Sequence, residues 1–186
     1  MYKKEIENYI NKEIEVIKSL DISSINTVMT AINDAYNAGS NIYIFGNGGS
    51  ASTASHMQND FNKGISERIE KKFNFVCLND NVPTVMAIAN DSGYEYIFEN
   101  QLKGKLKQND LVIAISGSGN SENVIRAINY AKKQGIKTIG ITGYDGGKLA
   151  AIVDISFNVP VNDMQITEDV HMILDHLMMS VFMRVL

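Results

Sequence analysis

The stretch from Asn41 to Asp60 reads Asn-Ile-Tyr-Ile-Phe-Gly-Asn-Gly-Gly-Ser-Ala-Ser-Thr-Ala-Ser-His-Met-Gln-Asn-Asp. Its β-branched and aromatic start, residues 42–45, predicts a buried parallel strand. The glycines within 46–49 permit a tight turn that comes close to a ligand, and Ser50 offers an N-cap for a following helix. The free N–H groups at such a helix start favour a bound anion such as phosphate. A purely structural turn is the alternative, because the stretch is neither a Walker loop nor a regular dinucleotide fingerprint.

A second unit of the same kind follows later in the chain. The apolar run Leu111 to Ile115 leads into Ser116-Gly117-Ser118-Gly119-Asn120-Ser121. In an open parallel sheet such loops lie at the carboxyl ends of the strands, and ligands bind where neighbouring loops diverge. The duplication therefore favours a phosphate site lined by serine hydroxyls over two solvated turns.

The composition is that of one ordinary globular domain, and it favours a small molecule as the binding partner. The chain has 186 residues, 45% of them hydrophobic, and a formal net charge of −4 from 17 basic and 21 acidic residues. Without a basic run, nucleic acid and anionic membrane surfaces are not indicated as partners. The single Cys77 suggests a buried thiol in a reducing compartment, and the N-terminus lacks the apolar core of a signal peptide. We therefore expect a cytoplasmic protein.

Strands alternate with helices along the chain, which predicts a doubly wound α/β domain. The expected strands are 42–45, 73–78, 111–115, 136–141 and 154–159. The expected helices are 3–19, 24–37, 50–63, 82–89, 94–106, 121–134 and 166–186, with a turn at the glycines of 143–147. We predict a single domain over 1–186 with a five-stranded parallel sheet of order 2-1-3-4-5, as in flavodoxin-like folds. Residues 1–39 form N-terminal helices, 40–160 the α/β core and 164–186 the C-terminal helical segment.

Both terminal helices carry more apolar surface than a single domain this small can cover. Residues 3–19 place isoleucines and Tyr9 on one stripe, and residues 166–186 are apolar on nearly every side. We therefore predict a homo-oligomer whose terminal helices bundle at the interface.

The C-terminal helix also contains charged residues that need partners if they are buried. His171 and Asp175 are four residues apart, on one helix face, and we interpret them as a structural pair.

Two imidazoles and two carboxylates then remain as a candidate site. His56 and Asp60 are neighbours on the helix after the first glycine turn, and Glu168 and His176 lie on the last helix. Such a set suits zinc or a similar divalent ion, or equally acid/base catalysis. Glu168 and His176 are separated by about 12 Å of helix, too far to bind one metal ion from one chain. If both serve one site, a neighbouring subunit supplies one of them.

These motifs together resemble the sugar isomerase (SIS) domain family and, within it, the phosphoheptose isomerases. The resemblance covers nearly the whole chain. Its matching features are Gly46-Asn47-Gly48-Gly49-Ser50, His56 with an acid four residues later, Ala89-Asn90-Asp91, the serine loop at 116–121, Gly143-Tyr144-Asp145-Gly146-Gly147, and an acidic or amide residue eight before His176.

The resemblance implies an aldose–ketose isomerase that acts on a sugar phosphate, sedoheptulose 7-phosphate above all, as a tetramer with active sites between subunits. It implies catalytic roles for Asp60, Glu168 and His176, and a zinc or other divalent metal site at His56, Asp60, Glu168 and His176. The implied substrate-binding residues are Asn47, Gly48, Gly49, Ser50, Asn90, Asp91, Ser116, Gly117, Ser118 and Ser121.

The chain departs from the family pattern at four positions. Asp60 replaces a glutamate, Glu168 a glutamine, Gly117 a threonine and Gln165 an aspartate. A non-catalytic regulator that binds a sugar phosphate or a protein partner is the alternative function, since a fold alone does not specify chemistry. Asp60 and His176 favour the enzyme because they are the acid/base groups that such a regulator lacks.

Overall fold

The computed structural model describes residues 1–186 and contains one five-stranded parallel sheet of order β2-β1-β3-β4-β5. The strands are β1 (Ile42–Gly46), β2 (Phe75–Cys77), β3 (Leu111–Ser116), β4 (Lys137–Gly143) and β5 (Ile155–Val159). The predicted strand order and parallel pairing are confirmed.

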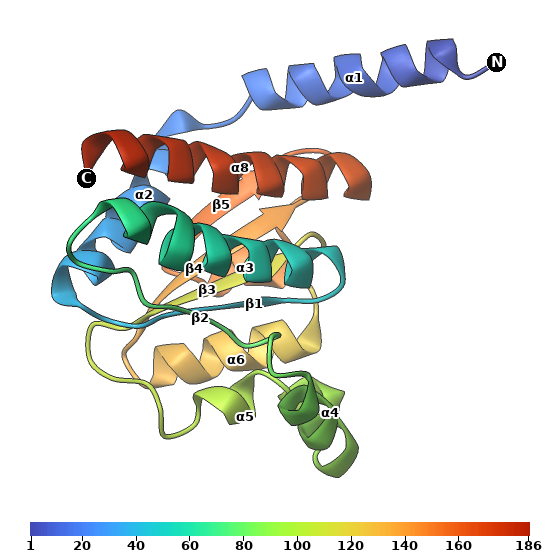
Figure 1. The fold of residues 1–186 in the computed structure, drawn as a ribbon. Helices are drawn as coiled ribbons and strands as arrows, with labels where there is room; N and C mark the ends of the chain where they lie inside the picture. The colour runs from blue at the N-terminus through green and yellow to red at the C-terminus, as the bar shows by residue number, and fades with distance from the viewer.

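Helices cover both faces of this sheet (Figure 1). One face carries α2 (Ile22–Ala38), α3 (Gly49–Asn59) and α8 (Met164–Val185), and the other carries α4 (Val82–Asp91), α5 (Glu99–Leu102), α6 (Glu122–Lys133) and α7 (Gly147–Ile152). Helix α1 (Lys3–Lys18) lies outside α8 and projects beyond the sheet. None of these helices combines the length and apolar character that a membrane span needs.

Alternation along the strands divides the core in two, because successive strand residues point to opposite faces. On β1, Ile42 and Ile44 pack into the core beneath α2, α3 and α8, whereas Tyr43 and Phe45 pack into the core beneath α5 and α6. The apolar run at 42–45 is therefore buried on both sides, as a central parallel strand requires.

One prediction about helices was wrong. The single helix expected over 94–106 is instead a 3-10 turn at Tyr94–Tyr96 followed by the short α5, because buried Gln101 donates to the backbone oxygens of Leu78 and Ile97. The turn expected at the glycines of 143–147 is confirmed, and the short α7, which the sequence did not predict, begins at its last glycine, Gly147.

The helix expected over 50–63 begins and ends differently. Its N-cap is Gly48, with φ +53°, so Ser50 lies inside the first turn and is not the cap. Beyond α3 the chain continues as a π-helix, Asp60–Ile65, and a 3-10 turn, Ser66–Arg68. Wide π turns recur at functional sites, and this one begins at a predicted site residue, Asp60.

Candidate functional site

The loops after β1, β3 and β4 meet at the carboxyl edge of the sheet. The N–H of Gly143 donates to Gly117 O, and the N–H of Leu149 donates to Gly119 O, both over 2.9 Å. The pairing of Gly46 with Ile115 brings the glycine loop after β1 beside the serine loop after β3, so their predicted convergence is observed.

Asn47 connects the first loop to the start of α6. The side-chain amides of Asn47 and Asn123 bond reciprocally at 2.9 Å, and the Tyr94 hydroxyl donates to Asn47 Oδ1 at 2.9 Å. An open cavity of about 580 Å³, lined mainly by polar residues, lies here. Its lining residues are Asn47, Tyr94, Glu95, Ser121, Glu122, Asn123 and Arg126. Tyr94 and Arg126 carried no sequence signal, because only the fold brings them beside the loops.

Hydroxyl groups and free N–H groups gather at the same edge. Ser116 Oγ and Ser121 Oγ are 3.5 Å apart, and Ser118 Oγ accepts from the N–H of Asn120. At the start of α3, Ala51 is the first residue whose N–H bonds back to the turn, at Asn47 O and Gly48 O. The two N–H groups before it lack helical acceptors, which is the arrangement that binds phosphate at helix N-termini.

Two predicted substrate residues make no hydrogen bond to these loops in the single chain. Asn90 and Asp91 are exposed at the end of α4, where Asn90 Nδ2 donates to Asp91 Oδ1 over 2.8 Å. Neither side chain hydrogen-bonds to the loops.

The glycines at two predicted substrate positions are explained by close approach of α8. A methyl group on Gly117 would lie 2.6 Å from Met164 Sδ, and one on Gly49 would lie 2.4 Å from the carboxylate oxygens of Glu168. Gly117 therefore accommodates the start of α8, and Glu168 lies against the N-terminal end of α3.

A second group of functional side chains lies at the other end of α3. His56 and Asp60 from the α3 side face Asp175 and His176 from α8, and one donor atom from each lies within 4.8 Å of the others. The Nε2 atoms of His56 and His176 are 3.2 Å apart, and His56 Nε2 is 3.5 Å from Asp60 Oδ2. The chemistry of this donor set fits a divalent cation such as zinc.

Asp175 and His171 do not form the expected pair, so that prediction was wrong. His171 Nε2 donates to Thr142 O over 3.0 Å, while both carboxylate oxygens of the fully buried Asp175 lack a hydrogen-bond partner. Burial, and then the charge of Asp60, raises the pKa of Asp175 to about 7. His171 and Asp175 do lie on one face of α8, because they are four residues apart. His171 nevertheless bonds to the backbone oxygen of Thr142 in the sheet and not to Asp175.

Within one chain the loops and the His/Asp cluster are far apart. Gly49 and Asp60 are separated by eleven residues, about 16 Å at about 1.5 Å per helical residue. Glu168 lies at the loop end of α3 and His176 at the cluster end, as their spacing on α8 predicted.

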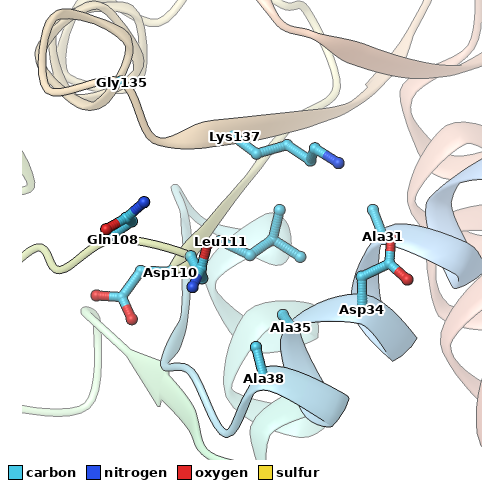
Figure 2. Close-up of a pocket in the computed structure, with 10 residues that line it drawn as sticks. Ala31, Asp34, Ala35, Ala38, Gln108, Asp110, Leu111, Gly135 and Lys137 are labelled. Carbon is cyan, nitrogen blue, oxygen red and sulfur yellow. The ribbon is translucent and has the colours of Figure 1, made fainter.

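Another cavity, of about 340 Å³, lies at the opposite edge of the sheet (Figure 2). It is lined by α2 and by the residues that precede or begin β3 and β4, among them Asp34, Asp110 and Lys137. Ligands of doubly wound sheets bind at the carboxyl edge, so this cavity lies outside the candidate site.

Comparison with known proteins shows the family of this chain. Residues 5–143 match the SIS domain family. A phosphoheptose isomerase of Thermodesulfovibrio yellowstonii is 42% identical over 159 residues, 85% of this chain and 78% of that protein. A phosphoheptose isomerase of Helicobacter pylori is 34% identical over 169 residues, 91% of this chain and 85% of that protein.

Among solved structures, the phosphoheptose isomerase of Neisseria gonorrhoeae superposes with a TM-score of 0.90 at 27% identity, and the match covers 100% of both chains. The converging glycine and serine loops, the strand order and these similarities together show that the chain belongs to the SIS domain family, in its phosphoheptose isomerase group.

Proposed function

We propose that the protein is an aldose–ketose isomerase that converts sedoheptulose 7-phosphate to D-glycero-D-manno-heptose 7-phosphate, which feeds heptose and polysaccharide biosynthesis. The observation that carries the proposal is the pairing of phosphate-type loops with an acid/base His/Asp cluster, in a chain of the phosphoheptose isomerase group. We expect it to act in the cytoplasm, where the free thiol of Cys77 stays reduced.

The loops hold the substrate in register. The serine hydroxyls of 116–121 and the free N–H groups of Gly49 and Ser50 bind the phosphate, and Asn47, fixed by Asn123 and Tyr94, contacts the sugar chain. Binding of the substrate phosphate fixes the position of the sugar, so that the proton passes between a substrate carbon and a base that are already in place. Asn90 and Asp91 are assigned to the substrate by the family resemblance and reach it in the assembled protein.

The reaction moves one proton between adjacent carbons. A carboxylate removes the proton from C1 of the ketose, an acid protonates the C2 oxygen to give an enediol, and return of a proton to C2 with loss of the O1 proton yields the aldose. Asp60 is our proposed base, Glu168 is the second candidate, and His176 is the proposed acid. His56, Asp60 and His176 would also hold zinc or another divalent ion, which supplies polarisation of the carbonyl and hydroxyl oxygens.

The assembly has to complete the site, because the loops and the cluster of one chain are about 16 Å apart along α3. We propose a homo-oligomer, a tetramer by family resemblance, in which the loops of one subunit face the cluster of another. The exposed apolar stripe of α1 supports such an assembly.

The test is to incubate the purified, zinc-loaded protein with sedoheptulose 7-phosphate and to follow aldose formation by NMR. We expect turnover in the wild type and a loss of about 100-fold or more in kcat for Asp60→Asn, the range typical of a removed general base. Glu168→Gln restores the residue usual in the family and separates the two candidate bases: it keeps most activity if Asp60 is the base.

Asp34→Asn is the matched control, because it neutralises an exposed carboxylate at the opposite edge of the sheet and should leave kcat unchanged. Absence of conversion in the wild type, with and without zinc, would refute this substrate. Tight binding of the sugar phosphate without turnover, insensitive to Asp60→Ala, would favour the regulator instead.

A further inference from the structure

Gly46 ends β1 and leads directly into the glycine loop. Two residues earlier, Ile44 O accepts from the N–H of Leu78 over 2.9 Å, which is the last backbone bond between β1 and the β2 side of the sheet. The N–H and C=O of Gly46 face the same side, but β2 has already ended at Cys77. No strand residue is left there to pair with Gly46.

The side chain of Asn79 takes the place of the missing strand residue. Asn79 Oδ1 accepts from the N–H of Gly46 over 3.2 Å, and Asn79 Nδ2 donates to Gly46 O over 2.9 Å. A side-chain amide carries both a donor and an acceptor, so it satisfies both backbone groups at once. These two bonds hold the peptide groups on either side of Gly46, and with them the direction in which the loop leaves the sheet.

The bond to Gly46 O also determines which N–H groups the loop presents. In an α-helix each N–H donates to the carbonyl oxygen four residues before it, so Gly46 O is the regular acceptor for the N–H of Ser50. Ser50 packs directly on Gly46, because a methyl group on Gly46 would lie 2.7 Å from Ser50 Cβ. Gly46 O nevertheless accepts from Asn79, and the N–H of Ser50 donates to no backbone oxygen. Asn79 thus occupies the acceptor that would otherwise bind an N–H of the anion site.

We propose that Asn79 is a positioning residue of the phosphate site, whose amide holds Gly46 so that the N–H groups of Gly49 and Ser50 face the ligand. All of these groups belong to one chain, so the positioning is the same whichever subunit completes the site. The inference rests on the proposed function for the role of the two N–H groups. It is measured with inorganic phosphate and without turnover, so failure of the isomerase assay and failure of this inference are separate results.

The test compares Asn79→Leu with Asn62→Leu in the full-length protein. Asn62 is the matched control, because its amide makes the same two bonds, with the N–H and the C=O of Phe75, both over 2.8 Å, at the other end of β2. Inorganic phosphate is titrated into each isotope-labelled protein, and binding is followed by NMR at the amides of Gly49 and Ser50. We expect Asn79→Leu to raise the Kd for phosphate about 10-fold, as for a loop that adopts its binding conformation about a tenth of the time. Asn62→Leu should keep the Kd of the wild type.

A measurement on the wild type does not depend on the folding of either variant. Coupling is reciprocal, so bound phosphate must stabilise the bonds between Asn79 and Gly46 if these bonds favour its binding. Phosphate at about ten times its Kd should slow hydrogen exchange of the Gly46 amide about 10-fold and leave the Phe75 amide unchanged.

Four results would overturn the inference. In the wild type, they are phosphate that shifts neither the Gly49 nor the Ser50 amide, and exchange at Gly46 that does not respond to phosphate. Among the variants, they are folded Asn79→Leu with the phosphate affinity of the wild type, and Asn62→Leu with as large a loss of affinity as Asn79→Leu.

Discussion

His171 shows how strongly burial acts on single residues of α8. Its ring is 1% exposed, and Nε2 donates to Thr142 O at the end of the sheet. Burial lowers the pKa of His171 to about 4, and the bond to Thr142 O offsets only part of that effect. The imidazole is therefore neutral in the folded protein at physiological pH and becomes charged readily only when the chain unfolds.

This difference predicts a pH dependence of the unfolding free energy. Between pH 6.5 and about 4, His171 is protonated in the unfolded state but stays neutral in the folded state. The free energy of unfolding is therefore unaffected by His171 above pH 6.5 and decreases as the pH falls through this range. The loss amounts to on the order of 3 kcal/mol at pH 4. In His171→Gln, urea unfolding of the metal-free protein should show a correspondingly smaller loss between pH 7 and pH 4. Parallel curves for the two proteins would contradict the prediction.

Among the elements, the loop after β3 is held by the neighbouring loop after β4. Gly119 has φ +63°, and a methyl group there would lie 2.1 Å from the backbone oxygen of Gly146. Gly104 has a similar φ of +71° but nothing within 4 Å. The two glycines therefore share a backbone conformation and differ in their surroundings.

Gly119→Ala and Gly104→Ala form a matched pair. The left-handed conformation costs alanine roughly 1–2 kcal/mol at either position. At Gly119 the loops after β3 and β4 must also move apart. This movement adds roughly 1–3 kcal/mol to the loss of stability and displaces the serines of the phosphate site. We expect chemical denaturation to show the larger loss of stability in Gly119→Ala, and only that variant to show a raised KM for the sugar phosphate. Equal losses of stability in both variants would mean that the contact with Gly146 carries no energy.

For the whole molecule, the position of α1 is the main argument for assembly. None of its residues is buried, and its only hydrogen bonds to the body of the protein run from Tyr9 to Asp169 and from Lys12 to Asp163. An apolar stripe of Ile6, Tyr9, Ile10, Ile14 and Ile17 remains at least 36% exposed. An unpaired stripe of this kind on a projecting helix is typical of an interface between subunits.

We predict that charge on this stripe breaks the oligomer. Light scattering after size exclusion should give the wild type a mass that is a multiple of 20.6 kDa, and Ile10→Glu a smaller species. Asn8→Glu introduces the same charge on the opposite side of α1 and should leave the mass unchanged. If the site spans two subunits, Ile10→Glu should also lose isomerase activity. An unchanged mass for Ile10→Glu would place the interface elsewhere.

Much of this architecture was readable from the sequence because it depends on local patterns. Apolar runs that end in glycine and serine loops predicted the parallel strands, and right-handed crossovers allowed few orders, of which 2-1-3-4-5 is confirmed. Positions four apart on a helix placed His56 beside Asp60, and their 3.5 Å contact bears this out. The ligand and catalytic roles of the site residues stay predictions.

Only the tertiary structure decided which side chains of α8 face α3. That helix is apolar on nearly every side, so its periodicity does not identify a single buried face, and spacing alone suggested His171 as the partner of Asp175. In the packed structure His171 bonds to the backbone oxygen of Thr142 instead. Asp175 lies beside His56, Asp60 and His176, whereas Glu168 lies at Gly49, at the opposite end of α3. Periodicity specifies neighbours within one helix, whereas contacts between helices depend on the rotation and translation at which they dock.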